Sequence, residues 1–359
     1  MTWVYDPLPA PTAFDVRVQR AGPAVAVWLW TLAALVFLMV VVGGATRLTE
    51  SGLSITEWKP LTGVIPPLSE ADWRAEFENY KHIPQYSAVF PDMDLGGFKF
   101  IFFWEWSHRL LGRLIGLATL LPLIFFWARG QLPAALKPKL IGVLALGALQ
   151  GFVGWWMVKS GLTGRVEVAQ ERLAIHLMLA SLTFAVLVWL AASLREKRAA
   201  VPAPPRALGV WANIFIVAVL AQIGLGALVA GLRAGRAYNT WPLIDGRFIP
   251  PLDQLTLLRP VWRNFVDNLL TVQFQHRMVA YAVLAFALAQ ALLTRRSAGA
   301  GGASRRANAL AGLVAAQALI GITTLVLVVP LWAGLLHQAF AMIVLGMAVA
   351  HAQALAQAR

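Results

Sequence analysis

The sequence contains no cysteine among its 359 residues. This absence excludes thiolate metal sites, iron–sulfur ligation, thiol catalysis and structural disulfides. Charged residues are also scarce, at 13%, whereas soluble domains carry about 25%. Hydrophobic residues make up 59%, and the mean hydropathy is +0.67. A water-exposed surface cannot be built from this inventory. The composition therefore excludes a soluble enzyme, a disordered regulator and a nucleic-acid-binding module, and it indicates a polytopic membrane protein.

The net charge of +13 does not predict nucleic acid as a partner. Most lysines and arginines stand in short clusters between apolar runs, which is typical of the cytoplasmic loops of membrane proteins. The first 23 residues contain Asp6, Asp15, Arg17 and Arg20 and no continuous apolar stretch. We therefore expect neither a cleaved signal peptide nor an arginine-rich transit peptide at this end.

Eight stretches are long and apolar enough to cross a bilayer, which takes roughly 20 residues. They are approximately Ala24–Ala45, Phe103–Ala128, Leu140–Val158, Leu173–Leu194, Leu208–Gly231, Val272–Thr294, Ala307–Val329 and Leu331–Ala354. Pro330 separates the last two, which favours a sharp break over one very long helix. The sequence thus predicts an all-α membrane protein with eight transmembrane helices, embedded in a lipid bilayer.

Loop charges predict the orientation of these helices. Basic clusters precede the first helix and follow the second, fourth and sixth: Arg17 and Arg20; Arg129, Lys137 and Lys139; Arg195, Lys197, Arg198 and Arg206; Arg295, Arg296, Arg305 and Arg306. The positive-inside rule places them, and with them both termini, on the cytoplasmic side. The opposite side receives the long outer loop 46–102, whose eight acidic residues outnumber its five basic ones.

An internal repeat divides the chain into two halves. WKPLTGVIPPL (Trp58–Leu68) after the first helix is matched by WPLIDGRFIPPL (Trp241–Leu252) after the fifth, and the next helices open with EWSHR and QFQHR. We therefore predict two tandem, pseudo-symmetric four-helix bundles in the same orientation. The predicted segments are a cytoplasmic N-terminal segment 1–23, an N-terminal half 24–198, a cytoplasmic linker 199–207 and a C-terminal half 208–359.

Four of the six histidines stand near the outer start of even-numbered helices: His108, His176, His276 and His337. An ionisable side chain at membrane depth is a functional candidate because burying it without a partner is costly. The alternative for any one of them is a hydrogen-bonded residue in helix packing. Equivalent places in two repeats favour ligands instead. We expect His82 at the surface of the outer loop. His351 has no histidine counterpart fourteen residues after His276, so we interpret it as incidental.

Bis-imidazole ligation of haem needs paired histidines that face each other between helices, without cysteine or a carboxylate cage. Zinc is the competing metal, but its usual sites add carboxylate or thiolate ligands at close spacing, and none appear here. Pairing within the halves joins His108 to His176 and His276 to His337. The corresponding separations, 68 and 61 residues, are similar, as a repeat requires. The sequence predicts two haem sites, one in each half.

The two halves differ beside the first histidine of each pair. Glu105 lies three residues before His108 and on the same side of the helix, whereas the matching residue of the second half is Gln273. A carboxylate near a metal in a low dielectric can move protons or stabilise positive charge on a substrate. Glu105 is therefore the candidate catalytic residue. In the alternative interpretation it faces water or pairs with Arg109.

Arginines crowd the same level of the predicted membrane, and a guanidinium binds carboxylates bidentately. The candidate contacts for haem propionates are Arg47, Arg109, Arg165, Arg236 and Arg277. Other arginines at this level, such as Arg113, are expected to extend to the interface. Tryptophans such as Trp241 are candidates to flank a porphyrin, although an interfacial aromatic belt explains most of them.

Several of these strings resemble haem A synthase, with the closest likeness to its proteobacterial and mitochondrial branch. They are GGATRLTESGLSITEWKPLTGVIPPL (Gly43–Leu68), EWSHRLLGR (Glu105–Arg113), ERLAIHL (Glu171–Leu177), NTWPLIDG (Asn239–Gly246), FQHRMVAY (Phe274–Tyr281) and LLHQ (Leu335–Gln338). The resemblance spans nearly the whole chain. Members of the family from Gram-positive bacteria carry a cysteine pair in the first outer loop, which this chain lacks, so a redox role for that pair does not apply here.

The resemblance implies an enzyme of the bacterial inner membrane that oxidises the C8 methyl of haem O to a formyl group. The reaction proceeds through hydroxylated intermediates and gives haem A for cytochrome oxidase. The resemblance also implies a substrate haem between His108 and His176, a haem b cofactor between His276 and His337, and a catalytic role for Glu105. The implied partners are haem O, an electron donor and, through the shared substrate, haem O synthase. The donor's identity, the source of oxygen and a homo-oligomeric state stay open.

Two other functions would use the same residues. A di-haem b-type membrane cytochrome that exchanges electrons with quinol would use all four histidines and leave Glu105 structural. A non-catalytic haem transporter or chaperone would hold both haems weakly and form no product. The fate of bound haem O distinguishes these functions from a synthase.

Overall fold

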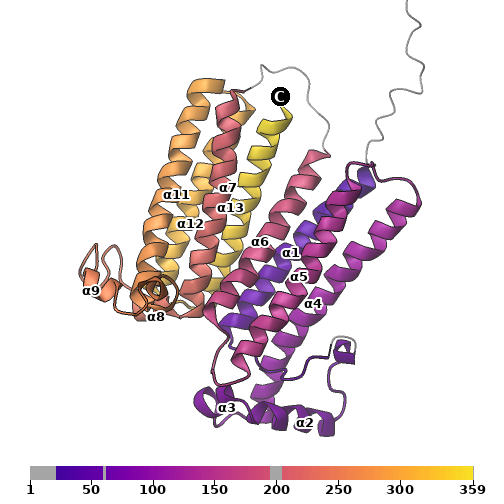
Figure 1. Ribbon diagram of the computed structural model, residues 1–359, viewed down its shortest axis with the longest axis vertical. Helices are drawn as coiled ribbons and strands as arrows, with labels where there is room; N and C mark the ends of the chain where they lie inside the picture. The colour runs from indigo at the N-terminus through magenta and orange to yellow at the C-terminus, as the bar shows by residue number, and fades with distance from the viewer. Residues whose placement is uncertain (1–21, 60–61, 195–203, 359) are drawn as a thin grey trace, which may run out of the picture.

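The structure, a computed structural model, describes residues 22–59, 62–194 and 204–358. In these ranges eight helices are long and apolar enough to cross a membrane (Figure 1). They are α1 (Pro23–Leu48), α4 (Leu95–Ala128), α5 (Lys137–Gly161), α6 (Gln170–Ser193), α7 (Arg206–Gly231), α11 (Leu269–Ala298), α12 (Gly302–Val326) and α13 (Leu331–Gln357). Each coincides with one predicted stretch. The described residues form no strand, only an isolated bridge between Ile244 and Arg247. The all-α membrane fold is therefore confirmed.

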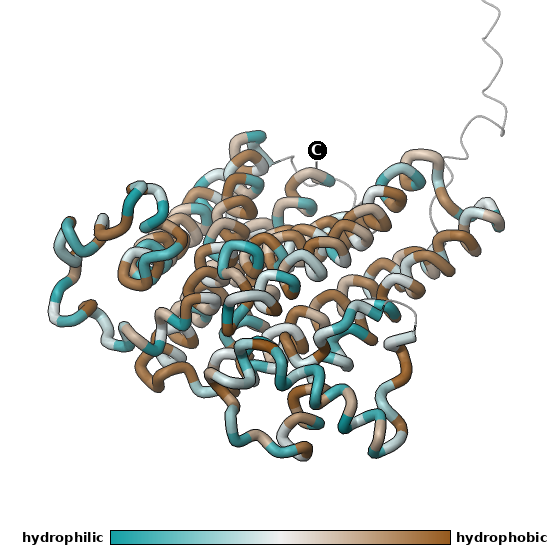
Figure 2. The backbone as a smooth tube through the Cα atoms, turned by 60° about the horizontal axis from the view of Figure 1, so that its bottom comes forward, coloured by the Kyte–Doolittle hydropathy of each residue, from teal (hydrophilic) through white to brown (hydrophobic). Residues whose placement is uncertain are grey.

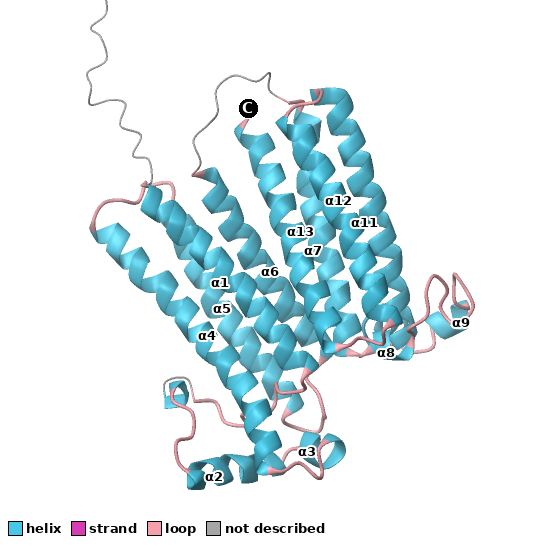
Figure 3. Cartoon of the chain, turned by 180° about the vertical axis from the view of Figure 1, so that it is seen from behind, coloured by secondary structure: helices cyan, strands magenta, loops and turns pink. Residues whose placement is uncertain are grey.

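The eight long helices form two groups of four. In the first group α1 and α5 each contact α4 and α6, and in the second α7 and α12 each contact α11 and α13. The groups meet where α6 contacts α7 and α13 and where α1 contacts α13. Figures 1 and 3 show the two groups side by side. This arrangement agrees with the predicted pair of four-helix bundles.

The limits of the two halves stay a prediction. The segments 1–21 and 195–203 lie outside the described residues. They hold part of the predicted linker 199–207 and several of the basic residues that predict the topology, namely Arg17, Arg20, Arg195, Lys197 and Arg198. In the described part, α1 begins and α13 ends at one end of the molecule, opposite the outer loop 46–102 (Figure 1).

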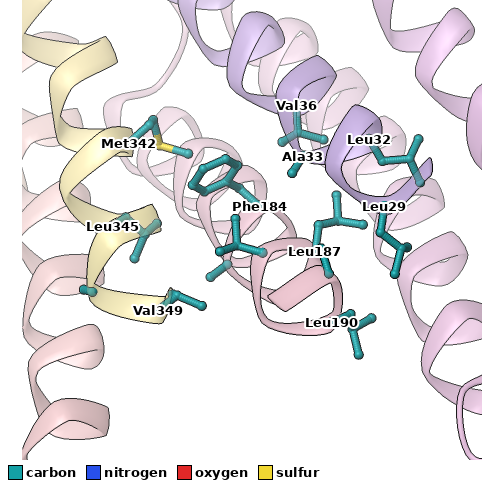
Figure 4. Close-up of a cluster of buried hydrophobic side chains, with 14 of the residues drawn as sticks. Leu29, Leu32, Ala33, Val36, Phe184, Leu187, Leu190, Met342, Leu345 and Val349 are labelled. Carbon is teal, nitrogen blue, oxygen red and sulfur yellow. The ribbon is translucent and has the colours of Figure 1, made fainter. Parts of the chain in front are cut away.

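A hydrophobic core lies where α1, α6 and α13 meet, between the two bundles (Figure 4). Leu29 and Leu32 of α1, Phe184 and Leu187 of α6 and Leu345 of α13 are each at most 7% exposed. Lipid is as apolar as leucine, so this core stabilises the fold by close packing rather than by removal from water. The helices are mostly hydrophobic along their length, and hydrophilic residues are frequent in the connecting segments (Figure 2). Many large hydrophobic side chains of the helices are exposed, such as Leu121 and Leu288.

The predicted outer loop 46–102 is largely folded. It contains three short helices, η1 (Thr62–Val64), α2 (Glu70–Lys81) and α3 (Pro84–Val89). In addition, α4 begins at Leu95, whereas the sequence predicted a start at Phe103. The prediction was wrong because glycines and a lysine lower the hydropathy of these first turns. Asp94 nevertheless starts the helix there, since its side chain accepts a hydrogen bond from Gly97 N at 2.8 Å.

Aromatic packing fixes the outer loop on the start of α4. Trp73 and Phe102 have ring centroids 4.9 Å apart, and Phe77 stacks on Phe98 at 5.0 Å. Tyr80 is fully buried in the same cluster, and this burial raises the pKa of its hydroxyl. Leu53 and Ile55 belong to the cluster as well, so it also positions the backbone that follows α1.

The equivalent connection of the second bundle, between α7 and α11, contains four short helices. They are α8 (Ala234–Ala237), α9 (Leu252–Leu255), η2 (Val261–Arg263) and α10 (Asn264–Asp267). Asn264 holds this connection together by bonding the backbone N and O of Leu258, both at 2.9 Å. Asn268 then caps α11 by accepting a hydrogen bond from Leu270 N at 3.0 Å.

The predicted break at Pro330 is present between α12 and α13. Val328 and Val329 adopt φ values of 62° and 57° in the left-handed region, which β-branched residues rarely adopt. Their amides bond the carbonyls of Leu325 and Thr324 at 2.9 and 2.8 Å. The turn is therefore held by its hydrogen bonds against an unfavourable backbone conformation.

We expect Val328→Gly to stabilise the protein by about 1 kcal/mol, because glycine adopts the left-handed conformation without steric cost. The Val328 side chain is 46% exposed, so little packing is lost. Thermal unfolding in detergent measures the effect. Val326→Gly is the matched control, since it changes the last helical residue of α12 and should lower the midpoint. A lower midpoint for Val328→Gly would contradict the inference that the left-handed backbone conformation at Val328 is unfavourable.

Candidate functional site

The four histidines lie on opposite helices of their bundles. His108 of α4 lies within electrostatic range of His176 of α6, and His276 of α11 within that of His337 of α13, with which it lines one cavity. In each bundle the two helices that carry the pair are separated by the other two helices. The structure thus brings together the two pairs that the sequence predicted. In the described ranges no three His, Asp or Glu side chains converge on a common point that would hold a bare metal ion.

Each histidine ring packs against a glycine of the preceding long helix. A Cβ added at the glycine would lie 3.1 Å from the ring at Gly43 (His108), 3.0 Å at Gly154 (His176), 3.1 Å at Gly226 (His276) and 2.7 Å at Gly321 (His337). Contacts this short would displace the rings. The absence of a side chain is therefore what lets each imidazole sit between two helices.

A glutamine supports three of the four histidines. Gln150 Nε2 donates to the His176 carbonyl at 3.1 Å and lies 3.1 Å from its Nδ1. The equivalent distances are 3.0 and 3.0 Å from Gln222 to His276, and 3.0 and 3.2 Å from Gln317 to His337. These glutamines were not predicted from the sequence. The signal is a glutamine four positions before three of the four cradling glycines, recognisable only once the facing helices are known.

A cavity of about 320 Å³ separates the histidines of the C-terminal bundle. His276 and His337 line it together with Gln222 and Gln317, and most of its wall is apolar. Its mouth is cationic and aromatic, formed by Arg47, Arg233, Arg236, Arg277, Trp241 and Tyr281. Two imidazoles in an apolar cavity with guanidinium groups at one end fit an iron porphyrin that carries two carboxylates.

Three of the five predicted arginines line this cavity. Arg277 is 6% exposed, donates to the carbonyls of Tyr238 and Leu243 at 3.0 and 3.4 Å, and has no partner for Nε among the described residues. Arg236 lies at the mouth with an exposed side chain. Arg47 is engaged by Glu167 and by carbonyls at the end of α7.

The other two predicted arginines, Arg109 and Arg165, do not line this cavity. Arg109 pairs with Glu105, and the exposed Arg165 donates to Gln170 at 3.1 Å. Arg233, which the sequence did not single out, forms ion pairs with both Glu50 and Glu167. Together with Arg47 it ties the end of α1 and Glu167 to the end of α7, and both arginines line the cavity.

Glu105 is buried and held by four hydrogen bonds. Its side chain is 3% exposed; Oε1 accepts from Arg109 Nη2 at 2.6 Å and Nε at 3.1 Å, and Oε2 accepts from Ser54 Oγ at 2.8 Å and Ile55 N at 2.9 Å. The pairing with Arg109 that the sequence left as an alternative is therefore present. Gln273 at the matching position donates to the Tyr238 carbonyl at 3.3 Å, and its Oε1 has no partner among the described residues.

A second cavity, of about 420 Å³, lies between the outer loop and α4. Lys59, Glu76, Trp106, Arg109 and Arg113 are among the residues that line it. Lys59 contacts Glu57 and Glu76 at 2.8 Å each, and these hydrogen bonds raise the pKa of its ammonium group. Charged groups therefore surround the outer approach to the Glu105–Arg109 pair.

The two remaining histidines lie apart from these sites. His82 is exposed in the outer loop, as predicted. His351 is fully buried in α13, and neither of its ring nitrogens has a hydrogen-bond partner among the described residues. The interpretation of His351 as incidental stays a prediction.

Known proteins resemble this chain along nearly its whole length. A family model described as cytochrome oxidase assembly protein (COX15-CtaA) matches residues 26–349. A protein of Beijerinckia indica named "Heme A synthase" is 71% identical over 355 residues, which is 99% of each chain. The chain belongs to this family. Proteins of the same name from Methylobacterium sp. and Bradyrhizobium diazoefficiens are 58% and 56% identical over 97% and 93% of this chain and 96% and 92% of their own. The resemblance found in the sequence strings is confirmed, and the chain is a multi-pass protein of a bacterial membrane.

Proposed function

We propose that this chain is a haem A synthase, an enzyme that oxidises haem O to haem A for cytochrome oxidase. The geometric observation that carries the proposal is the duplicated pair of facing histidines, of which one pair lies beside a buried carboxylate. The near-full-length identity to relatives named "Heme A synthase" supports it independently. The same geometry fits a di-haem cytochrome less well, since such a carrier has no use for an acid in one half only.

The C-terminal bundle is the proposed site of a haem b cofactor. The observations that fit are the glycine cradles behind His276 and His337, the apolar cavity between them and the unpartnered Nε of Arg277. The two histidines would ligate the iron, while Arg277, Arg236 and Arg47 would contact the propionates. Bound there, haem b would supply one-electron transfer. Gln222 and Gln317 would orient the two imidazoles, as outer partners of metal ligands do.

The N-terminal bundle is the proposed site of the substrate, haem O. His108 and His176 would hold its iron, and Glu105 would act at the reacting methyl group. Arg109, Ser54 and the Ile55 amide fix the direction of both carboxylate oxygens. A carboxylate held in this way needs no reorganisation before it takes a proton or stabilises positive charge. Arg109 and Arg165 are the proposed propionate contacts of this half.

The proposed location is the inner membrane, with both termini in the cytoplasm. The described basic residues Arg129, Lys137, Arg206 and Arg295 lie at helix ends away from the outer loop, as this topology requires. The proposal further includes an electron donor and, through the shared substrate only, haem O synthase as a functional partner.

The chemical identity of the bound haems tests this function. We expect extraction and chromatography of purified protein, supplied with haem O and a reductant, to yield haem b together with haem A or its hydroxylated precursor. A di-haem cytochrome would return only unaltered haems. A transporter would release haem O unchanged from weak, exchangeable sites. Either of these results would contradict the proposal that the chain is a haem A synthase.

A further inference from the structure

The surroundings of His108 differ from those of the other three paired histidines. Three units consist of a glutamine, a glycine four residues later and the histidine that packs on that glycine: Gln150, Gly154 and His176; Gln222, Gly226 and His276; Gln317, Gly321 and His337. In the unit of His108 the glycine is Gly43, and the residue four positions before it is Met39. A thioether has no proton to donate and is a weak acceptor, so this unit lacks the amide.

The His108 ring is held differently as a result. In the three glutamine units the Cε1 and Nδ1 edge of the ring faces the glycine, whereas at Gly43 the nearest atoms are His108 Nε2 and Cδ2, at 3.1 and 3.4 Å. The His108 ring makes no hydrogen bond to any residue that the structure describes. Met39 instead lies against Gly112, one turn after His108, where its Cε would be 3.5 Å from an added Cβ. The other three units have alanine at that position, namely Ala180, Ala280 and Ala341.

The glutamine amide can restrain a metal-ligating imidazole in two ways. It donates to the main-chain carbonyl of the histidine, and its Nε2 lies 3.0–3.2 Å from the ring Nδ1 in all three units and 3.3–3.4 Å from the ring Nε2 in the units of His176 and His276. The Oε1 atoms of Gln150, Gln222 and Gln317 are buried and have no hydrogen-bond partner among the described residues. An amide turned over about its Cγ–Cδ bond would present this acceptor to an Nδ1–H. Partners of this kind fix the ring orientation and raise the basicity of a ligating histidine.

We propose that Met39 makes His108 the labile ligand of the N-terminal site. This inference rests on the proposed function, in which the N-terminal half must admit haem O and release haem A, whereas the C-terminal half retains its cofactor. Both ligands of the retained haem have a glutamine, and so does His176. Only His108 can turn away from the iron without breaking a side-chain hydrogen bond. Met39 is therefore a positioning residue that acts through His108 and sets the rate at which the substrate porphyrin exchanges.

The test measures haem release from full-length protein in detergent, under anaerobic conditions and without added reductant or oxidant, so that no conversion occurs. Excess apomyoglobin captures the released haem, and chromatography of the remaining protein separates haem O from haem b. We expect Met39→Gln to slow the loss of haem O about fivefold, the factor that one ordinary hydrogen bond contributes. Met39→Leu, which has a similar size and no amide, should release haem O at the wild-type rate. Loss of haem b should be unchanged in both variants.

The reverse substitution gives a second, independent measurement. Gln150→Met removes the amide from His176 and should accelerate the loss of haem O about fivefold, while haem b retention shows that the protein is folded. Equal rates of haem O loss from Met39→Gln and Met39→Leu, or an unchanged rate in Gln150→Met, would overturn the inference about Met39. Neither result would contradict the proposed haem A synthase function. Wild-type protein that binds no haem O through histidine would instead contradict the proposed function itself.

Discussion

Alanine at His276 or at His337 is expected to abolish the low-spin haem b spectrum of the purified protein. A low-spin bis-imidazole spectrum needs both axial ligands, and within the described residues no other histidine lines the cavity between α11 and α13. The loss should be complete for each single variant, because one imidazole cannot hold the iron in a six-coordinate state. Optical spectra and electron paramagnetic resonance of the oxidised protein measure it.

His82→Ala is the control for this experiment. His82 is exposed in the outer loop and remote from both pairs, so its variant should keep the wild-type spectrum. His351→Ala distinguishes a ligand from a buried structural histidine, since it should alter stability without removing the low-spin signal. An unchanged spectrum in His276→Ala or His337→Ala would refute the ligand assignment.

Glu105→Gln is expected to lower haem A formation at least about 100-fold, the lower range for loss of an acid–base group. Glutamine has nearly the same shape, and its single amide oxygen can still accept hydrogen bonds from Ser54 and from the Ile55 amide, whereas its NH2 group cannot replace the oxygen that accepts from Arg109. Arg109 also keeps its bonds to the carbonyls of Ile55 and Glu57. Haem binding should therefore stay intact. Haem A per bound haem, determined by extraction and chromatography, is the quantity to measure.

One control variant and the haem content of Glu105→Gln separate a catalytic from a structural role for Glu105. Glu70→Gln removes an exposed ion pair with Arg74, whose contribution to stability is about 0–1 kcal/mol, and it should leave haem A formation unchanged. A purely structural role would make haem content fall together with haem A in Glu105→Gln. Wild-type levels of haem A in that variant would count against catalysis by this residue.

Much of the fold follows from hydropathy, because a bilayer admits few structures. Every spanning segment must satisfy its own backbone hydrogen bonds, so an apolar run of about 20 residues becomes a helix. The break at Pro330 follows equally directly from the lack of an amide proton. The start of α4 does not, because Asp94 and the aromatic cluster around Phe98 extend that helix beyond the apolar run.

The candidate site likewise has features that the sequence predicts and features that only the tertiary structure shows. The repeat of EWSHR and QFQHR identifies two of the histidines and their asymmetry, Glu105 against Gln273, from the sequence alone. The partners of Glu105 come from Ser54 and Ile55, about fifty residues earlier, and no local pattern predicts that contact. The ion pairs of Arg233 with Glu50 and Glu167 join three separate segments and were missed for the same reason.

The sequence by itself determined the class of protein, the number of spanning helices and the family, and it singled out the four histidines as candidate ligands. Each of these depends on composition, periodicity or short strings, which are local properties of the chain. Only the tertiary structure decided which helices face each other, and with that the glycine cradles, the glutamine supports and the exceptional place of Met39. These features depend on distances between segments, and two helices that pack together in a membrane need share no pattern that is visible along the chain.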